Sequence, residues 1–161
     1  MNGLTLKALR SFLFFTAPEA ARMIGFVQER SWRRWEAGGA PVPTDVKVGI
    51  RALIISREML LKQYISDIKK AGDKPVSLTF YTSIDHWLDA PVMWRIHCSV
   101  MAELAANLKN IELLGFDFVS YKKWLGNKDD NKINRAAWST ASKLSPIPAI
   151  NRTIRITTGS L

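Results

Sequence analysis

Residues 16–36, TAPEAARMIGFVQERSWRRWE, limit the fold more than any other part of this sequence, because they hold the signals for two short helices and a turn. Thr16 and Glu19 have the S/T-x-x-E spacing of a capping box, in which two side chains satisfy free amide groups at the start of a helix. Pro18 falls in the first turn, where a missing amide hydrogen costs no helical hydrogen bond. The first helix is therefore predicted to begin near Ala17.

The second short helix follows a turn at Gly25, which can take the left-handed conformation that ends a helix. Because successive helical residues are about 100° apart, Trp32 and Trp35 fall within about 60° of each other and mark the buried side of this helix. Ile24 supplies apolar contact from the first helix. We therefore expect four residues to anchor the pair of helices: Trp32, Trp35, Ile24 and Gly25.

The opposite side of the second helix is cationic. Arg30 lies almost opposite the two tryptophans, and Arg33 and Arg34 flank it. An α-helix fits the major groove of DNA, and arginine can donate two parallel hydrogen bonds to guanine. The alternative is a merely solubilising face, but the preceding short helix, the turn and the tryptophan pair favour a helix-turn-helix. The predicted DNA-binding residues are Arg30, Arg33, Arg34, Ser31 and Gln28.

The composition indicates a folded protein with an anionic partner. With 161 residues, of which 47% are hydrophobic, the chain can bury the core of one domain or of two small ones. Its formal net charge of +9 favours nucleic acid over a membrane surface, since no segment joins a strongly basic face to a membrane-seeking apolar one. Cys98 is the single cysteine, so no internal disulfide is expected. Without a signal-peptide pattern or an apolar run of membrane-spanning length, we expect a cytoplasmic protein.

A helix over residues 4–15 is expected to pack on the pair. Its inner side carries Leu6 and Leu13, whereas Lys7 and Arg10 are predicted to face outward. Together with the two short helices it would form the start of a small bundle.

The middle of the chain predicts one long helix and one strand. The helix runs from a cap at Thr44 or Asp45 to about Lys70, because apolar residues recur every three or four positions and Gly72 follows as a stop. Apolar and polar residues alternate over residues 76–81, which is typical of a half-buried strand. Since one strand is not stable alone, its own copy across a two-fold axis is the expected partner.

Further helices and a basic extension follow the strand. Ser83 can cap a short helix, and Pro91 starts a longer one with a broad apolar side. Residues 116–125 are aromatic and are expected to pack. The polar residues 127–161 predict a solvated, mobile tail or a weak helix, with a poor strand candidate at 154–157. A phosphate- or RNA-binding arm is the alternative for this extension.

The predicted fold class is mainly α, with an N-terminal helix-turn-helix bundle of four to five helices and a small α+β C-terminal dimerisation region with one short strand. The expected parts are a helix-turn-helix DNA-binding domain over residues 1–70, a dimerisation region over residues 71–110 and a basic C-terminal extension over residues 111–161. The residues predicted to form the dimer contact are Leu78, Phe80, Trp94, Val100 and Leu104.

Several short strings resemble one known family. They are LKALR, PEAA, RSW..WE.G...VP, LTFY and SVMAEL, spread over residues 1 to about 108. On these strings the sequence resembles the phage anti-CRISPR-associated transcriptional regulators, which belong to the phage-repressor helix-turn-helix class. The resemblance implies a homodimer that binds inverted repeats in the promoter of its own operon and switches that operon off.

The resemblance also places Arg30 where these regulators carry their base-reading arginine. Other polar or aromatic residues occur in the family at the positions of Arg33 and Arg34, so the DNA sequence bound here can differ. Two features depart from the family pattern: the linker before Trp94 is short, and the chain continues beyond the usual end.

Motifs for catalysis or metal binding are missing from the sequence. His86 and His97 are the two histidines, and His97 and its neighbour Cys98 would point about 100° apart on one helix, so a core or interface histidine is the better interpretation. We predict no enzyme, cofactor or metal. The expected partners are double-stranded DNA, the protein's own mRNA and a second copy of the chain, in the cytoplasm and nucleoid of a bacterial host. An RNA-binding translational regulator and an antitoxin-type interaction protein stay open as alternatives.

Overall fold

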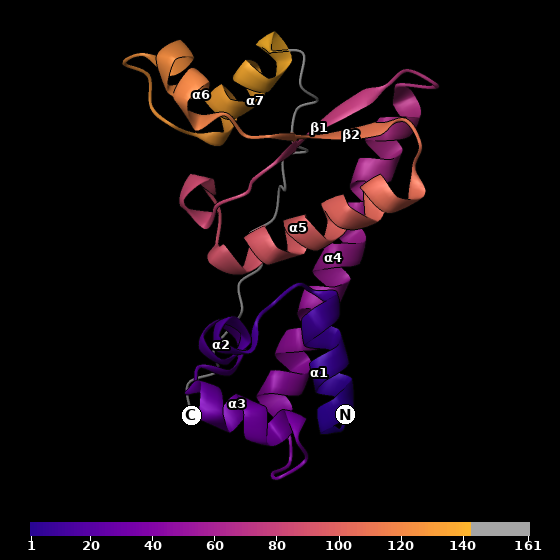
Figure 1. Ribbon diagram of the computed structural model, residues 1–161, viewed down its shortest axis with the longest axis vertical. Helices are drawn as coiled ribbons and strands as arrows, with labels where there is room; N and C mark the ends of the chain where they lie inside the picture. Colours follow the sequence, from indigo (N-terminus) through magenta and orange to yellow (C-terminus); the bar gives the residue numbers. More distant parts are fainter. Residues whose placement is uncertain (143–161) are drawn as a thin grey trace.

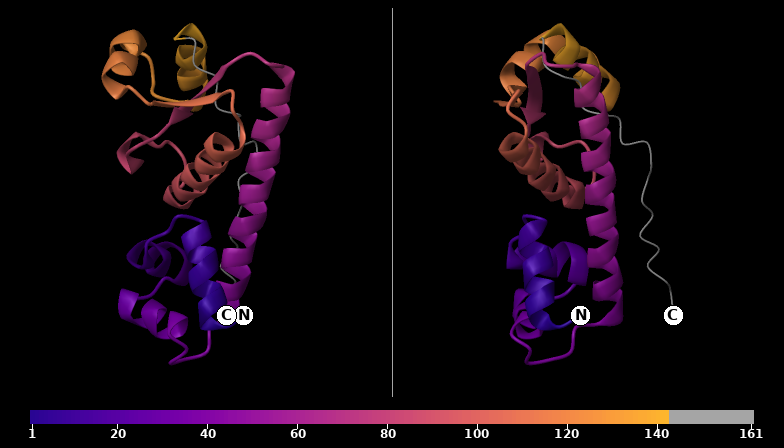
Figure 2. Two further views of the ribbon diagram at one scale, coloured as in Figure 1. Left: turned by 45° about the vertical axis from the view of Figure 1, so that its right-hand side comes forward. Right: turned by 90° about the vertical axis from the view of Figure 1, so that its right-hand side faces the viewer.

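The computed structural model describes residues 1–142 of the chain. One long helix, α4 (Thr44–Lys70), runs most of the height of the molecule (Figure 1). The first three helices lie against its first half, and a small sheet with further helices lies at its second half. Figure 2 shows both groups on the same side of α4. We call them the N-terminal unit (residues 1–43) and the C-terminal unit (residues 76–142).

The N-terminal unit has the predicted pair of short helices. Its elements are α1 (Gly3–Phe12), α2 (Ala17–Ala20), the π-helical turn η1 (Ala21–Gly25) and α3 (Glu29–Glu36). The start of α2 at Ala17 is confirmed. Both capping-box hydrogen bonds are present, from Thr16 N to Glu19 Oε2 at 2.9 Å and from Glu19 N to Thr16 Oγ1 at 3.4 Å. α1 is shorter than the predicted 4–15, because Phe14 adopts a left-handed backbone conformation with φ 64°.

The long helix has the predicted limits but not the predicted cap. Pro43 is its N-cap residue, and no side chain there accepts a hydrogen bond from the helix. Thr44 is already the first helical residue, so the expectation of a cap at Thr44 or Asp45 is wrong. Asp45 still places a negative charge in the first turn, where it interacts favourably with the positive end of the helix dipole.

The C-terminal unit contains a strand that the sequence analysis did not predict. β1 (Val76–Phe80) pairs in parallel with β2 (Ile111–Gly115), with Val76 opposite Ile111. The short helix η2 (Ile84–His86) and α5 (Pro91–Asn107) form the crossover between the strands. The predicted strand is confirmed, but the expectation of a single strand is wrong, because β1 has a partner in the same chain. Pairing with a second copy stays a prediction. The predicted boundary at residue 110 falls between two hydrogen-bonded strands.

The extension folds further than predicted. It forms α6 (Phe118–Leu125) and α7 (Lys132–Ala141), which lie beyond the carboxyl ends of β1 and β2 (Figure 1). Residues 132–141 are therefore an ordered helix rather than mobile chain, because Trp138 is buried among Phe116 and Tyr121. The strand candidate at 154–157 lies outside the described residues.

Two hydrophobic clusters hold the described chain together. The larger one joins the N-terminal unit, α4, α5 and β1, and includes Leu6, Trp32, Ile50, Tyr64 and Val100. The smaller one gathers Tyr81, Trp94, Cys98, Phe116, Tyr121, Leu125 and Trp138. Among the helices of residues 1–142, none has the length and apolar character needed to cross a membrane.

Candidate nucleic-acid interface

Helix α3 is fastened to the N-terminal unit by its first tryptophan. The Trp32 side chain has no exposed surface, and its Nε1 donates a hydrogen bond to Glu36 Oε1 at 2.7 Å. The Trp35 ring meets it edge-on, with centroids 5.9 Å apart. Ile24 is also buried in this core. The side of α3 that carries the two indoles therefore faces the protein.

Gly25 has a different role from the predicted one. The left-handed residue in the turn is Phe26, with φ 50°, so the prediction of a left-handed Gly25 is wrong. Gly25 is small for a packing reason instead: a Cβ atom there would lie 3.0 Å from Cε3 of Trp32. The backbone of Gly25 thus lies directly against the anchoring indole.

A buried ion pair beneath α3 escaped the sequence analysis. Arg10 Nε donates to Glu36 Oε1 at 2.6 Å, and Arg10 Nη1 donates to the carbonyl oxygen of Phe15 at 2.8 Å. The two charged side chains are 13% and 7% exposed, so the prediction that Arg10 faces outward is wrong. The available signal was Glu36 itself, a carboxylate four residues after Trp32 and hence on the inner side of α3.

The five predicted DNA-binding residues, Arg30, Arg33, Arg34, Ser31 and Gln28, are all exposed. Arg33 Nε donates to Glu29 Oε1 at 2.6 Å on the surface of the same helix. Arg34 Nε donates to the carbonyl oxygen of Gly39 at 3.0 Å. Arg30 takes part in none of the ion pairs formed within residues 1–142. Of the three arginines on this face, Arg30 is therefore the one whose guanidinium can meet a partner without giving up a hydrogen bond or an ion pair in that part of the chain.

The two units are tied together by ion pairs between distant parts of the sequence. Arg95 of α5 forms a two-pronged contact with Glu19, from Nε at 3.0 Å and from Nη2 at 2.7 Å to Oε1. Burial alone would raise the pKa of Glu19, but the hydrogen bonds from Arg95 and Thr16 hold this pKa below its usual value. The same carboxylate therefore caps α2 and attaches it to α5.

A second link runs through the middle of α4. Arg57 is buried, and its Nε donates to Ser99 Oγ at 3.0 Å. Its Nη2 pairs with Glu103 of α5, and its guanidinium lies 4.2 Å from the ring centre of Phe12 at the end of α1. Arg57 therefore contacts both units, and with Arg95 it joins the N-terminal unit to α5.

One of the two histidines, His97 of α5, lies in the core. His97 is 1% exposed and is surrounded by the rings of Tyr64, Phe80, Tyr81 and Trp87. Burial lowers the pKa of His97 to about 4, so its imidazole is neutral near pH 7. The prediction of a core histidine is confirmed. Within the described part of the chain, no group of three or more His, Cys, Asp or Glu side chains is arranged to hold a metal ion.

The residues predicted to form a dimer contact pack in the core of a single chain. Four of them are buried, at exposures of 3% for Leu78, 9% for Trp94, 0% for Val100 and 2% for Leu104, and Phe80 is half-buried. Trp94 Nε1 also donates to the carbonyl oxygen of Tyr81 at 2.9 Å. These side chains stabilise the chain's own fold, and a role between chains stays a prediction.

Comparison with known proteins agrees with the predicted resemblance. A family model described as Aca2/YdiL-like matches residues 1–113, which hold the N-terminal unit, α4, β1 and α5. The "Aca2 repressor" of Pectobacterium phage ZF40 is 34% identical over 110 residues, which is 63% of this chain and 90% of that relative. Helices α6 and α7 lie beyond the matched residues of the family model. The chain belongs to the Aca2/YdiL-like family of regulators.

Proposed function

We propose that this protein is a transcriptional repressor that recognises a specific DNA sequence through the outer face of α3. The observation that carries the proposal is the exposed Arg30, which has no ion-pair partner within residues 1–142, on a helix whose opposite side is anchored by Trp32. The name of the similar phage protein, a repressor, agrees with this role.

The chemistry of this face suits base recognition. A short helix held at its back by a buried indole can enter the major groove as a rigid body. Arg30 can then donate two parallel hydrogen bonds to O6 and N7 of a guanine. Arg33 can exchange its exposed pair with Glu29 for a DNA contact at little cost, since exposed ion pairs contribute about 0–1 kcal/mol.

Two further residues would help to orient the helix. Ser31 and Gln28, at the start of α3, carry uncharged polar groups that can bond to phosphate oxygens or base edges. Arg34 can do the same if it releases the carbonyl oxygen of Gly39. These contacts would position α3, whereas Arg30 would carry most of the sequence preference.

The active form is proposed to be a homodimer on an inverted repeat in the promoter of its own operon, in the cytoplasm of a bacterial host. Two copies of α3 would enter successive major grooves about 34 Å apart, and the bound dimer would block polymerase. The residues predicted for the dimer contact are buried or half-buried in a single chain, so their role between two chains stays a prediction.

Selection of bound sequences from random duplex DNA tests this function. The full chain should enrich an inverted repeat with a guanine in each half-site. Enrichment of no sequence at all would contradict the proposal. Sedimentation of the complex would give the number of chains per duplex, which should be two.

The protein's own mRNA is the second candidate partner, supported by the net charge of +9. The major groove of an RNA duplex is too deep and narrow for a helix such as α3, so this surface fits duplex DNA better. Competition of the transcript against the selected duplex separates the two partners: RNA should displace DNA only at a large excess.

A further inference from the structure

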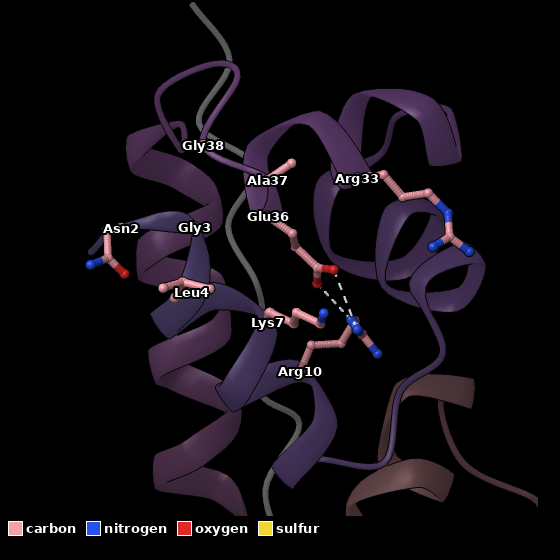
Figure 3. A pocket seen from close by; sticks show the side chains of 9 residues that line it. All are labelled: Asn2, Gly3, Leu4, Lys7, Arg10, Arg33, Glu36, Ala37 and Gly38. Atoms are coloured by element: carbon pink, nitrogen blue, oxygen red, sulfur yellow. Dashed lines mark hydrogen bonds and ion pairs between the residues drawn. The ribbon is translucent and has the colours of Figure 1, made fainter.

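A pocket opens beside the proposed base-reading face, between the first turns of α1 and the end of α3 (Figure 3). Its volume is about 670 Å³. The residues that line it are Asn2, Gly3, Leu4, Lys7, Arg10, Arg33, Glu36, Ala37 and Gly38. Arg33 belongs both to this wall and to the exposed face of α3, so a duplex lying on that face would also cover the pocket.

The pocket is positively charged. Its lining has three cationic side chains, Lys7, Arg10 and Arg33, against the single carboxylate of Glu36. That carboxylate is already engaged by Arg10 and by the Trp32 indole. Lys7 is exposed and takes part in none of the ion pairs among residues 1–142. Arg33 is paired with the exposed Glu29 and would have to exchange that pair for a ligand, so the unpaired charge near the rim comes from Lys7.

The wall that carries Lys7 is held rigidly against α3. A Cβ atom on Gly3 would collide with the carbonyl oxygens of Trp35 and Glu36, so the start of α1 touches the backbone at the end of α3. The Arg10–Glu36 ion pair joins the same two helices one turn after Lys7. The backbone of α1 at Lys7 thus has a defined position relative to the base-reading face before any ligand binds.

We propose that this pocket receives one phosphate group of the DNA backbone, held by Lys7 and Arg33. The inference rests on the proposed function, because it takes its ligand from the duplex that α3 would read. A phosphate diester is a small anion with two free oxygens, which matches a lysine on one wall and an arginine on the other. The contact would set the depth and direction of α3 in the groove and would carry no sequence information.

The first test compares the full-length parent with Lys7→Gln on the selected operator and on a scrambled duplex of the same composition. In a dimer this change removes two phosphate contacts, one in each half-site, so binding to both duplexes should weaken by about the same factor, roughly a hundredfold at 0.1 M salt. The slope of log affinity against log salt concentration should fall by about 2, which is about 1 for each contact. Lys7→Arg should restore the parent slope, and Lys69→Gln, the same change at the far end of α4, should leave affinity and slope unchanged.

The second test locates the contact on the DNA. Phosphates of the operator are replaced by uncharged methylphosphonates in symmetric pairs, one in each half-site. One such pair should weaken the parent about as much as Lys7→Gln does, and should weaken Lys7→Gln no further. If every position affected both proteins equally, or if Lys7→Gln matched the parent in affinity and slope, the phosphate site would be overturned.

The experiments distinguish a failure of the phosphate site from a failure of the proposed base recognition by α3. A parent that bound operator and scrambled duplex equally well would contradict the proposed function, yet Lys7→Gln would still lower the salt slope on both. A Lys7→Gln protein that lost its preference for the operator at an unchanged slope would instead show a base contact, which would overturn the phosphate assignment.

Discussion

Two arginines in the two units of this protein show how differently a positive charge can be used. Arg30 projects from α3 into solvent and has no ion pair within residues 1–142. Arg135 of α7 is 5% exposed, bonds to both carboxylate oxygens of Asp130 at 2.8 and 2.9 Å, and lies 4.7 Å from the ring centre of Phe116. The first charge is available to a partner, and the second holds α7 in place.

The difference matters because both residues count equally in the net charge. The basic extension suggested a phosphate- or RNA-binding arm. Its arginine within the described residues is Arg135, which is already paired with Asp130 inside the fold. Hydrogen bonds from Arg135 hold the pKa of Asp130 below its usual value, against the effect of burial. A binding surface is therefore identified by cations without internal partners rather than by the number of cations. The N-terminal and C-terminal units should therefore respond differently to substitution and to acid.

The largest effect is expected from Trp32→Ala. Truncating a fully buried tryptophan typically costs about 3–5 kcal/mol, and the change also removes a hydrogen bond to Glu36. Urea unfolding followed by circular dichroism should show this loss, and operator binding should disappear with it. Trp138→Ala is the matched control: it should loosen α7 but keep the operator preference. Equal loss of binding in both variants would mean that the units do not act separately.

Arg135→Met should destabilise the C-terminal unit by about 3 kcal/mol, because it leaves the partly buried Asp130 without its partner. Urea unfolding again measures the loss, and the double variant with Asp130→Asn should recover part of it. Operator preference should stay unchanged in both. A change in the selected DNA sequence would show that Arg135 belongs to the binding surface after all.

Acid should weaken the C-terminal unit before the N-terminal one, because His97 is buried there in its neutral form. Its pKa of about 4, against 6.5 in the unfolded chain, favours the folded state fully at pH 7 and progressively less as the pH falls from about 6.5 to about 4. At about 1.4 kcal/mol per pKa unit, the loss approaches about 3 kcal/mol. Unfolding free energies measured across this range should show the decline, and His97→Gln should flatten it.

Of the four changes, Arg30→Ala should have the smallest effect in kcal/mol and the largest effect on the preference for the operator over other DNA sequences. Operator affinity should fall by about 1–3 kcal/mol, and the preference over a scrambled duplex should shrink, with the unfolding free energy unchanged. Fluorescence anisotropy with both duplexes measures this. Arg30→Lys keeps the charge but not the two-pronged geometry, so it should keep the salt slope and lose the preference. Unaltered affinity in Arg30→Ala would remove the base-reading role.

Local features of the sequence were predicted well, because each depends on residues a few positions apart. The capping box of Thr16 and Glu19 located the start of α2, and the three- and four-residue recurrence of apolar side chains, with Gly72 as a stop, located α4. Alternation found β1. One local prediction was wrong: the left-handed residue is Phe26 rather than Gly25. Gly25 instead packs against the Trp32 ring.

Contacts between residues far apart in the sequence could not be predicted from such patterns. Strand β2 lacks alternation, so only its pairing with β1 reveals it. Arg10 and Glu36 are 26 positions apart, and Arg95 and Glu19 are 76 positions apart. No periodicity links residues at such separations.

The sequence alone specifies that one helix has an indole side and a guanidinium side, since a period of 3.6 residues places Trp32 and Arg30 on opposite faces. Which cations stay free depends on the folded arrangement of the chain. Charge is a property of the residue, but availability depends on which carboxylates and rings the folded chain brings within reach. Glu36 and Asp130 engage Arg10 and Arg135, and Arg30 and Lys7 remain at the surface.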